Sequence, residues 1–242
     1  MKPALGPAHH ALLMGWIAQE AVRVLGPIPS DDLLHDAMRR YGEERGSRMA
    51  QRALARGHAL DWTSYLAHKE WAAPDHPHAS ETVATTPHWR MRVTQCPWND
   101  AWQAEGLATY GRYYCRDIDQ AIVQGFNPAL SLSVGQTLPG DGDCCEFAYT
   151  GYVLDPEEEA RLEKLRADLG DSVVMPWSYH LGHLYWTMRR VFQEHTGAAG
   201  LAILERALST WERRFGTEAA DAIRAHEATD WTAPANPDAP TP

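Results

Sequence analysis

The spacing of the apolar residues changes twice along this chain, and these changes constrain the fold more than any other feature of the sequence. Apolar residues recur at helical spacing over residues 9–25 and again from residue 30. Apolar and polar residues alternate over residues 88–96 and 130–134, and residues 144–153 are aromatic and β-branched, which is typical of strands. Helical spacing returns from residue 156. Strands confined to the middle of a helical chain predict an α+β fold.

Capping and turn residues divide the helical parts. Ser30, followed by Asp31 and Asp32, is typical of a helix N-terminus, and we expect this helix to be interrupted near Gly42 and Gly46. Residues 72–87 contain three prolines and are expected to form a loop. Further helices are expected over residues 61–71, 106–126, 156–169, 177–195, 200–215 and 217–227.

The strand segments predict an antiparallel sheet. Residues 130–134 and 144–153 flank a glycine-rich turn and are expected to pair as a hairpin, with the helix over residues 106–126 crossing the sheet. The predicted architecture is α+β, with an antiparallel sheet of about three to five strands in the middle of the chain, covered by about seven to eight helices. Residues 1–230 are expected to form a single domain, and the proline-rich residues 231–242 a disordered tail.

The charge balance excludes several classes of partner. Among the 242 residues, 22 Lys and Arg stand against 32 Asp and Glu, which gives a formal net charge of −10. Nucleic acids and anionic membranes attract clustered cations, so neither is an expected partner. No apolar stretch approaches the roughly 18 residues that span a bilayer, and no secretory signal is visible. We expect a cytoplasmic protein whose partner is a small-molecule substrate; the sequence leaves its oligomeric state open.

The cysteines are the first candidates for chemistry. In a reducing cytosol, cysteines without the density of a disulfide scaffold are thiols, metal ligands or nucleophiles. Strand alternation places Cys145 on the same face as Phe147 and Tyr149, and Cys144 on the opposite face with Glu146. Cys145 therefore points to the apolar side, where it is either a nucleophile or a small buried hydrophobe.

A second thiol lies in the helix expected to cross the sheet. Asp119 follows Cys115 by four residues, so the two side chains can face one space on a helix. Positive charge from Arg112 and Arg116 would lower the pKa of this thiol. The same residues are also compatible with a surface pair of Arg and Asp beside a half-buried thiol.

Two histidines share one helical face. His180 and His183 are three residues apart and are accompanied by Tyr179 and other aromatic residues. This arrangement indicates acid–base chemistry or packing in the core. The sequence contains no Cys-x-x-Cys and no zinc-protease signature, so we expect no metal site and no cofactor.

Four short motifs occur in a recognisable order: YGEERG at residues 41–46, VTQCP at 93–97, YCRDID at 114–119 and GDCCEF at 142–147. Together they resemble the L-2-amino-thiazoline-4-carboxylic acid hydrolase family, over about residues 30–225. The resemblance implies an enzyme that opens 2-aminothiazoline-4-carboxylate, a cyclic isothiourea, to N-carbamoylcysteine. Water would add at the carbon between sulfur and nitrogen. The resemblance supports the type of reaction, ring opening by water, more strongly than it supports this particular substrate.

This chemistry needs a nucleophile or base, a proton donor for the leaving group and an anchor for a carboxylate. As hypotheses, Cys145 or Cys115 attacks the ring carbon, and Asp119 or Asp143 stabilises the amidine cation and accepts a proton. One of the two histidines protonates the leaving group. The residues expected to bind the substrate are Arg112, Arg116, Tyr114 and Tyr179.

A non-catalytic function is the main alternative. A small α+β domain with a cysteine-bearing strand is also similar to the 4-vinyl reductase type of ligand-binding module, which senses small hydrophobic molecules. Ten tryptophans would suit such a pocket. A sensor, however, needs no thiol paired with a carboxylate at a shared cavity, whereas a hydrolase does.

Overall fold

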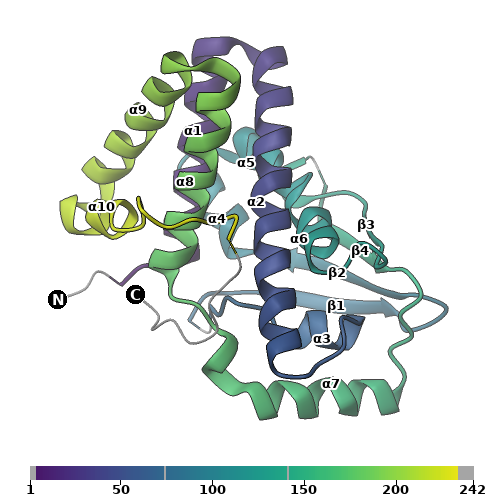
Figure 1. Ribbon diagram of the computed structural model, residues 1–242. Helices are drawn as coiled ribbons and strands as arrows, with labels where there is room; N and C mark the ends of the chain where they lie inside the picture. Colours follow the sequence, from purple (N-terminus) through teal and green to yellow (C-terminus); the bar gives the residue numbers. More distant parts are fainter. Residues whose placement is uncertain (1–3, 74, 141, 234–242) are drawn as a thin grey trace.

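Helices occupy both ends of the chain and a four-stranded sheet lies in the middle (Figure 1). The structure is a computed structural model that describes residues 4–73, 75–140 and 142–233. The helices before the sheet are α1 (Pro7–Leu25), α2 (Pro27–Ala55) and α3 (Trp62–Ala67). Those between the strands are α4 (Pro97–Ala104), α5 (Ala108–Cys115), α6 (Ile118–Phe126) and the short η1 (Leu138–Gly140). Those after the sheet are α7 (Pro156–Leu169), η2 (Gly170–Val173), α8 (Trp177–Thr196), α9 (Ala198–Phe215) and α10 (Thr217–Arg224).

The sheet is antiparallel throughout and has the order β1-β2-β4-β3, which confirms the predicted α+β class. Its strands are β1 (Ala79–Ala84), β2 (Trp89–Gln95), β3 (Leu132–Val134) and β4 (Cys145–Tyr149). Cys145 pairs with Val93, and both side chains are buried. On the opposite face, Arg92 donates a hydrogen bond to its neighbour Glu146 at 3.0 Å. Alternation along β4 therefore places Cys145 on the face that the helices cover, as the sequence predicts.

The helices α3, α5 and α6 pack near the buried face of the sheet (Figure 1). Trp62 of α3 lies edge-on to Tyr149 of β4, with ring centroids 5.1 Å apart. α6 packs against β3, and α5 packs against η1, just before β4. These contacts bring the end of α5, the start of α6 and the start of β4 into one region of the core.

Two regions between residues 72 and 126 differ from the sequence-based expectation. Residues 72–87, expected as a loop, contain β1, whose side chains are largely exposed and so carry no alternating apolar signal. The helix expected over residues 106–126 is instead α5 and α6, separated at Arg116 and Asp117. At this break Arg116 forms an ion pair with Asp117, and His35 Nδ1 of α2 lies 3.0 Å from Asp117 Oδ1. Cys115 thus ends one helix and Asp119 lies in the first turn of the next.

Helix α2 runs without interruption, contrary to the break expected near Gly42 and Gly46. Both glycines instead allow the backbones of α2 and α6 to meet. A Cβ atom at Gly46 would overlap the carbonyl oxygen of Ile122, and one at Gly125 of α6 would overlap the backbone of Glu43. The glycines of α2 are therefore explained by close packing of two helices rather than by a helix end.

The last described residues, at the end of the chain, begin with a side chain that packs against α8. Trp231, placed by the sequence in the disordered tail, is buried and stacks on His183 at 4.3 Å. The remainder of that predicted tail, residues 234–242, lies outside the described residues. Within the described residues, no helix combines the length and apolar character needed to cross a membrane.

The packing of α2 on α6 predicts that replacing a helix glycine by alanine lowers the free energy of unfolding instead of raising it. In an exposed helix, replacement of Gly by Ala stabilises by about 1 kcal/mol. We expect Gly46→Ala to destabilise the protein instead, by about 2 kcal/mol or more, because the new methyl group forces the helices apart. Urea unfolding measures the difference, with Ser47→Ala on the same helix as the control. A stabilised Gly46→Ala variant would contradict the close contact.

Candidate active site

Three thiols and one carboxylate of the core act on one another electrostatically: Cys96, Cys115, Asp119 and Cys145, called here the thiol–carboxylate cluster. The electrostatic field of Asp119 acts on all three thiols, and the field of Cys96 acts on the other two. Each member comes from a different element. They lie before α4, at the end of α5, in the first turn of α6 and at the start of β4.

The cluster is enclosed by the protein but keeps accessible surface. Cys145 is buried, whereas Cys96, Cys115 and Asp119 are half-buried. Burial nevertheless dominates the titration of all four groups and raises their pKa values. The cluster is therefore largely desolvated, and burial is the main influence on the charge state of its four groups.

Cys145, like Cys96, has a backbone N–H donor at its sulfur, whereas burial and neighbouring charges alone act on Cys115. Burial raises its pKa to about 11, and the N–H of Leu138 in η1, which donates to Cys145 Sγ at 3.3 Å, opposes this shift. Burial, together with the fields of Cys145 and Asp119, holds the pKa of Cys115 well above its usual value. Both thiols are thus protonated at neutral pH, and Cys145 has the donor that would stabilise a thiolate.

Asp119 is surrounded by groups that the sequence did not single out. Burial raises the pKa of Asp119, while the positive charges of Lys69 and Arg45 oppose the rise. The signal for Arg45 was present in the sequence, because it follows Tyr41 by four residues and so continues the apolar stripe of α2. Lys69 lies within the helix expected over residues 61–71, but α3 ends at Ala67, so only the structure reveals the position of Lys69.

Asp143 and Cys144 lie away from the cluster. Gln136 Nε2 donates to Asp143 Oδ1 and to Cys144 Sγ, both at 3.1 Å, and Asp143 is exposed. Asp143 therefore does not pair with Cys145 as the sequence suggested, because it precedes β4, which begins at Cys145, and its exposed carboxylate contacts Gln136 instead.

The two arginines expected to anchor a carboxylate are on the outer surface. Arg116 forms ion pairs with Asp31 at 2.8 Å and with Asp117 at 3.0 Å. Arg112 lies over the ring of Tyr113, with the guanidinium carbon 5.0 Å from the ring centroid. Both side chains are exposed, and the groups that they contact do not belong to the cluster.

His180 belongs to a second buried network, centred on Glu70. The Glu70 carboxylate accepts a hydrogen bond from Arg45 Nε at 2.9 Å and forms an ion pair with Arg52. The backbone carbonyl oxygen of Glu70 accepts a hydrogen bond from His180 Nε2 at 3.0 Å. Burial lowers the pKa of His180 to about 3, so the ring is neutral at neutral pH. The same Arg45 acts on Asp119, and through it the two networks adjoin.

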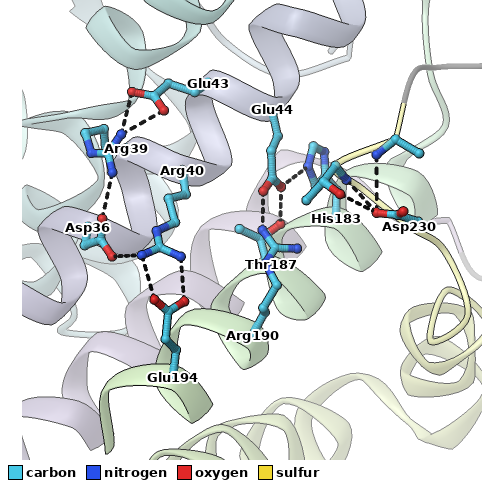
Figure 2. A network of polar contacts seen from close by, with 12 residues as sticks. Asp36, Arg39, Arg40, Glu43, Glu44, His183, Thr187, Arg190, Glu194 and Asp230 are labelled. Atoms are coloured by element: carbon cyan, nitrogen blue, oxygen red, sulfur yellow. Dashed lines mark hydrogen bonds and ion pairs between the residues drawn. The ribbon is translucent and has the colours of Figure 1, made fainter.

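His183 is held by a carboxylate of α2. Figure 2 shows Glu44 directed toward His183, Thr187 and Arg190 of α8, with His183 Nε2 and Glu44 Oε2 3.0 Å apart. Burial lowers the pKa of His183 to about 4, against the opposing field of Glu44. These contacts join two helices through Nε2 of His183, whereas its buried Nδ1 has no hydrogen-bond partner among the described residues.

The two predicted tyrosines lie in different networks. Tyr114 is buried next to the cluster, and its pKa is raised by burial and by the field of Tyr41, with Asp119 and Cys115 adding to the rise. Tyr179 accepts a hydrogen bond from Arg48 Nε at 2.9 Å and packs against Trp231. Of the two, Tyr114 is the one beside the thiols.

Among the described residues, no group of three or more His, Cys, Asp or Glu side chains is arranged to hold a metal ion. The cluster consists of thiols and a carboxylate under a field from Lys69 and Arg45. Such a set can bind a cation at Asp119 and offer a sulfur nucleophile beside it.

The Glu70 network makes a prediction about stability. Burial disfavours the charged Glu70 carboxylate, but Arg45 and Arg52 outweigh this cost and lower its pKa from 4.5 to about 2. We expect Glu70→Gln to destabilise the protein by about 3–5 kcal/mol, because it leaves two buried arginines without their counterion. Urea unfolding at pH 7 measures this loss. The exposed Glu163→Gln is the control, with an expected change within about 0.5 kcal/mol.

The pH dependence of this stability difference tests whether the ionised Glu70 carboxylate is its source. Because the folded-state pKa is depressed, the stabilisation by Glu70 is complete above about pH 4.5 and is lost as the pH falls toward 2. The difference between the wild type and Glu70→Gln should therefore shrink over this range. A difference that stays constant down to pH 2 would show that the ionised carboxylate is not its source.

Comparison with known proteins identifies one family. A family model described as L-2-amino-thiazoline-4-carboxylic acid hydrolase matches residues 8–149. The matched part runs from α1 to β4 and contains the whole thiol–carboxylate cluster and Lys69, whereas His180 and His183 follow it. No curated protein and no solved structure matches the chain.

Proposed function

Because the chain belongs to the L-2-amino-thiazoline-4-carboxylic acid hydrolase family, we propose that it opens a small cyclic isothiourea or related cyclic amidine by adding water at the carbon between the heteroatoms. The observation that carries this proposal is the convergence of Cys145, Cys115 and Asp119 in one enclosed cluster. With 2-aminothiazoline-4-carboxylate as the substrate, the product is N-carbamoylcysteine.

Asp119 binds the cationic end of the ring. A protonated 2-aminothiazoline carries its charge over the ring nitrogen, the exocyclic nitrogen and the carbon between them. Such a planar cation pairs well with a carboxylate in a partly desolvated site. Binding of a cation also lowers the pKa of neighbouring acids, so the substrate itself favours the ionised forms of Asp119 and Cys145.

Cys145 attacks the carbon between sulfur and nitrogen. Its proton passes to Asp119, the new bond from Sγ to carbon forms, and the bond from that carbon to the ring sulfur breaks. Asp119 then passes this proton to the ring sulfur, which leaves as a thiol, and the carboxylate is ionised again for the next step. The first step thus exchanges one carbon–sulfur bond for another, and Leu138 N–H stabilises the attacking sulfur.

Water completes the reaction. It attacks the same carbon of the enzyme-bound isothiourea, with Asp119 accepting its proton, and Cys145 leaves as a thiol. The substrate has then gained the atoms of one water molecule, and the carbon that lay between sulfur and nitrogen has become a urea carbonyl. Every step uses residues of the thiol–carboxylate cluster.

The nucleophile is tested by substitution. We expect Cys145→Ser to lower the rate of ring opening by about a thousandfold or more while substrate binding survives, because serine keeps the shape but removes the sulfur nucleophile. Release of the product thiol reports turnover. The adjacent Cys144→Ser, on the opposite side of the strand, is the matched control and should retain activity within about twofold.

Other outcomes assign other functions. Loss of activity in Cys115→Ser with a normal Cys145→Ser would move the nucleophile to α5. Wild-type rates in both variants, with loss in Asp119→Asn, would replace covalent attack by a water molecule that Asp119 activates. Tight binding of the ring by the wild type without any opening would indicate a ligand sensor of the 4-vinyl reductase type.

The raised pKa of Cys145 makes a separate prediction. Because this pKa is about 11, the thiolate fraction of the free protein grows about tenfold per pH unit between pH 7 and 10. Alkylation of Cys145 by iodoacetamide should accelerate in the same proportion. Mass spectrometry of the Cys144→Ser variant measures it without interference from the adjacent thiol. A rate that levels off by pH 8 would show that Cys145 is already ionised in the free protein.

A further inference from the structure

A hollow of about 220 Å³ lies between α2 and the last described residues of the chain. Residues of α2 between Glu43 and Arg48 line one side, and residues 231–233, after α10, line the other. None of the four residues of the thiol–carboxylate cluster lines it. The hollow is smaller than the roughly 300 Å³ at which sites for drug-sized molecules begin, so a ligand that fits it has few atoms.

The carboxylates that line the hollow are already paired. Both oxygens of Glu43 accept hydrogen bonds from Arg39 Nη1 at 2.8 Å. One oxygen of Glu44 pairs with Arg190, and the other lies 3.0 Å from His183 Nε2. Figure 2 shows both carboxylates directed toward these partners. The charge of each carboxylate is therefore balanced by an arginine, and neither needs a cation from the hollow.

Arg48 also lines the hollow, and its hydrogen-bond partners are neutral. Its Nε donates to Tyr179 Oη at 2.9 Å and its Nη1 to the carbonyl oxygen of Ala233 at 3.0 Å. The guanidinium carbon lies 5.4 Å from the centroid of the Trp231 ring. None of the ion pairs among the described residues includes Arg48, since the neighbouring carboxylates pair with other arginines. An arginine has five N–H donors, so Arg48 is fixed in position and still has donors and a positive charge for an anion.

Two buried nitrogens beside the hollow have no hydrogen-bond partner among the described residues: Nε1 of Trp231 and Nδ1 of His183. Trp231 lines the hollow, and His183 is held by Glu44, which lines it too. The two rings stack with centroids 4.3 Å apart and 8° between their planes, and the residues are 2% and 0% exposed.

The chemistry of these two nitrogens is complementary. An indole nitrogen can only donate. In the neutral His183 ring, Nε2 faces the Glu44 carboxylate and so carries the hydrogen, which leaves a lone pair on Nδ1. Adjacent rings thus hold one buried donor and one buried acceptor, and leaving both without a partner costs free energy.

We propose that the hollow is a second ligand site, which binds a small 2-hydroxycarboxylate. The carboxylate pairs with the guanidinium group of Arg48. A hydroxyl group can accept one hydrogen bond and donate another, so the 2-hydroxyl accepts from Nε1 of Trp231 and donates to Nδ1 of His183. One small molecule then satisfies all three groups. The site uses no residue of the thiol–carboxylate cluster, so the inference is independent of the proposed function.

The test compares lactate with propionate, which lacks only the hydroxyl, by isothermal titration calorimetry of the full chain at pH 7. Lactate should bind about tenfold more tightly, because its hydroxyl satisfies two buried groups. Arg48→Met should weaken the binding of both acids by about tenfold or more, and Arg48→Lys by less, because it keeps the charge. The exposed Arg213→Met is the control and should leave both affinities at the wild-type values.

A second variant tests the buried nitrogens. Trp231→Phe keeps an aromatic ring but removes the N–H donor, so it should lower the preference for lactate by about three- to tenfold with little effect on propionate. Urea unfolding confirms that each variant is folded. If Arg48→Met does not fold, Trp231→Phe decides, and an unchanged preference for lactate overturns the assignment.

The remaining outcomes are equally decisive. Equal affinities of the wild type for lactate and propionate would overturn the recognition of a hydroxyl. Affinities that survive Arg48→Met would overturn the role of Arg48. Absence of binding of either acid up to about 10 mM would overturn the site itself.

Discussion

The ion pairs of Glu70 with Arg45 and Arg52 are the interaction on which the rest of the site depends. They tie the segment after α3 to the middle of α2, and the carbonyl oxygen of the same residue binds α8 through His180. The attachment fixes Lys69 on one side and places the charge of Arg45 within the field of Asp119 on the other. A network that contains no thiol thus positions the groups around the thiols.

The charge state of the cluster suits a cationic substrate. In the free protein, burial keeps Cys145 and Cys115 protonated, which avoids several buried anions in one place. In the proposed mechanism, an amidinium bound at Asp119 would supply the missing positive charge when a thiolate is needed. Activation of the proposed nucleophile would then be coupled to occupation of the site, and an empty site would have little reactive thiolate to lose to oxidation.

Local patterns predicted β2, β3, β4 and the facing of Cys145, whereas β1 carries no alternating signal and contacts between distant segments decided the rest. The facing of Cys145 follows from the period of two along a strand, which needs no knowledge of the fold. At the break between Cys115 and Asp119, Asp117 contacts His35, which lies 82 positions earlier in the chain. The spacing of apolar residues along one helix gives no information about a contact with so distant a segment. His180 was expected beside the thiols, yet its ring is taken up by Glu70, whose position only the packing of α3 determines.

The contact of α2 with α6 through Gly46 and Gly125 fixes the distance between the backbones of these two helices. Arg45 and Asp119 lie on these two helices, and where the glycines meet no side chain separates the backbones. A side chain at an interface can adopt another rotamer to admit a larger ligand, but a backbone-to-backbone contact has no such freedom. The spacing of the charges is therefore set by the main chain, and new substrate preferences would arise more readily by exchanging the groups around the ring than by widening the space for it.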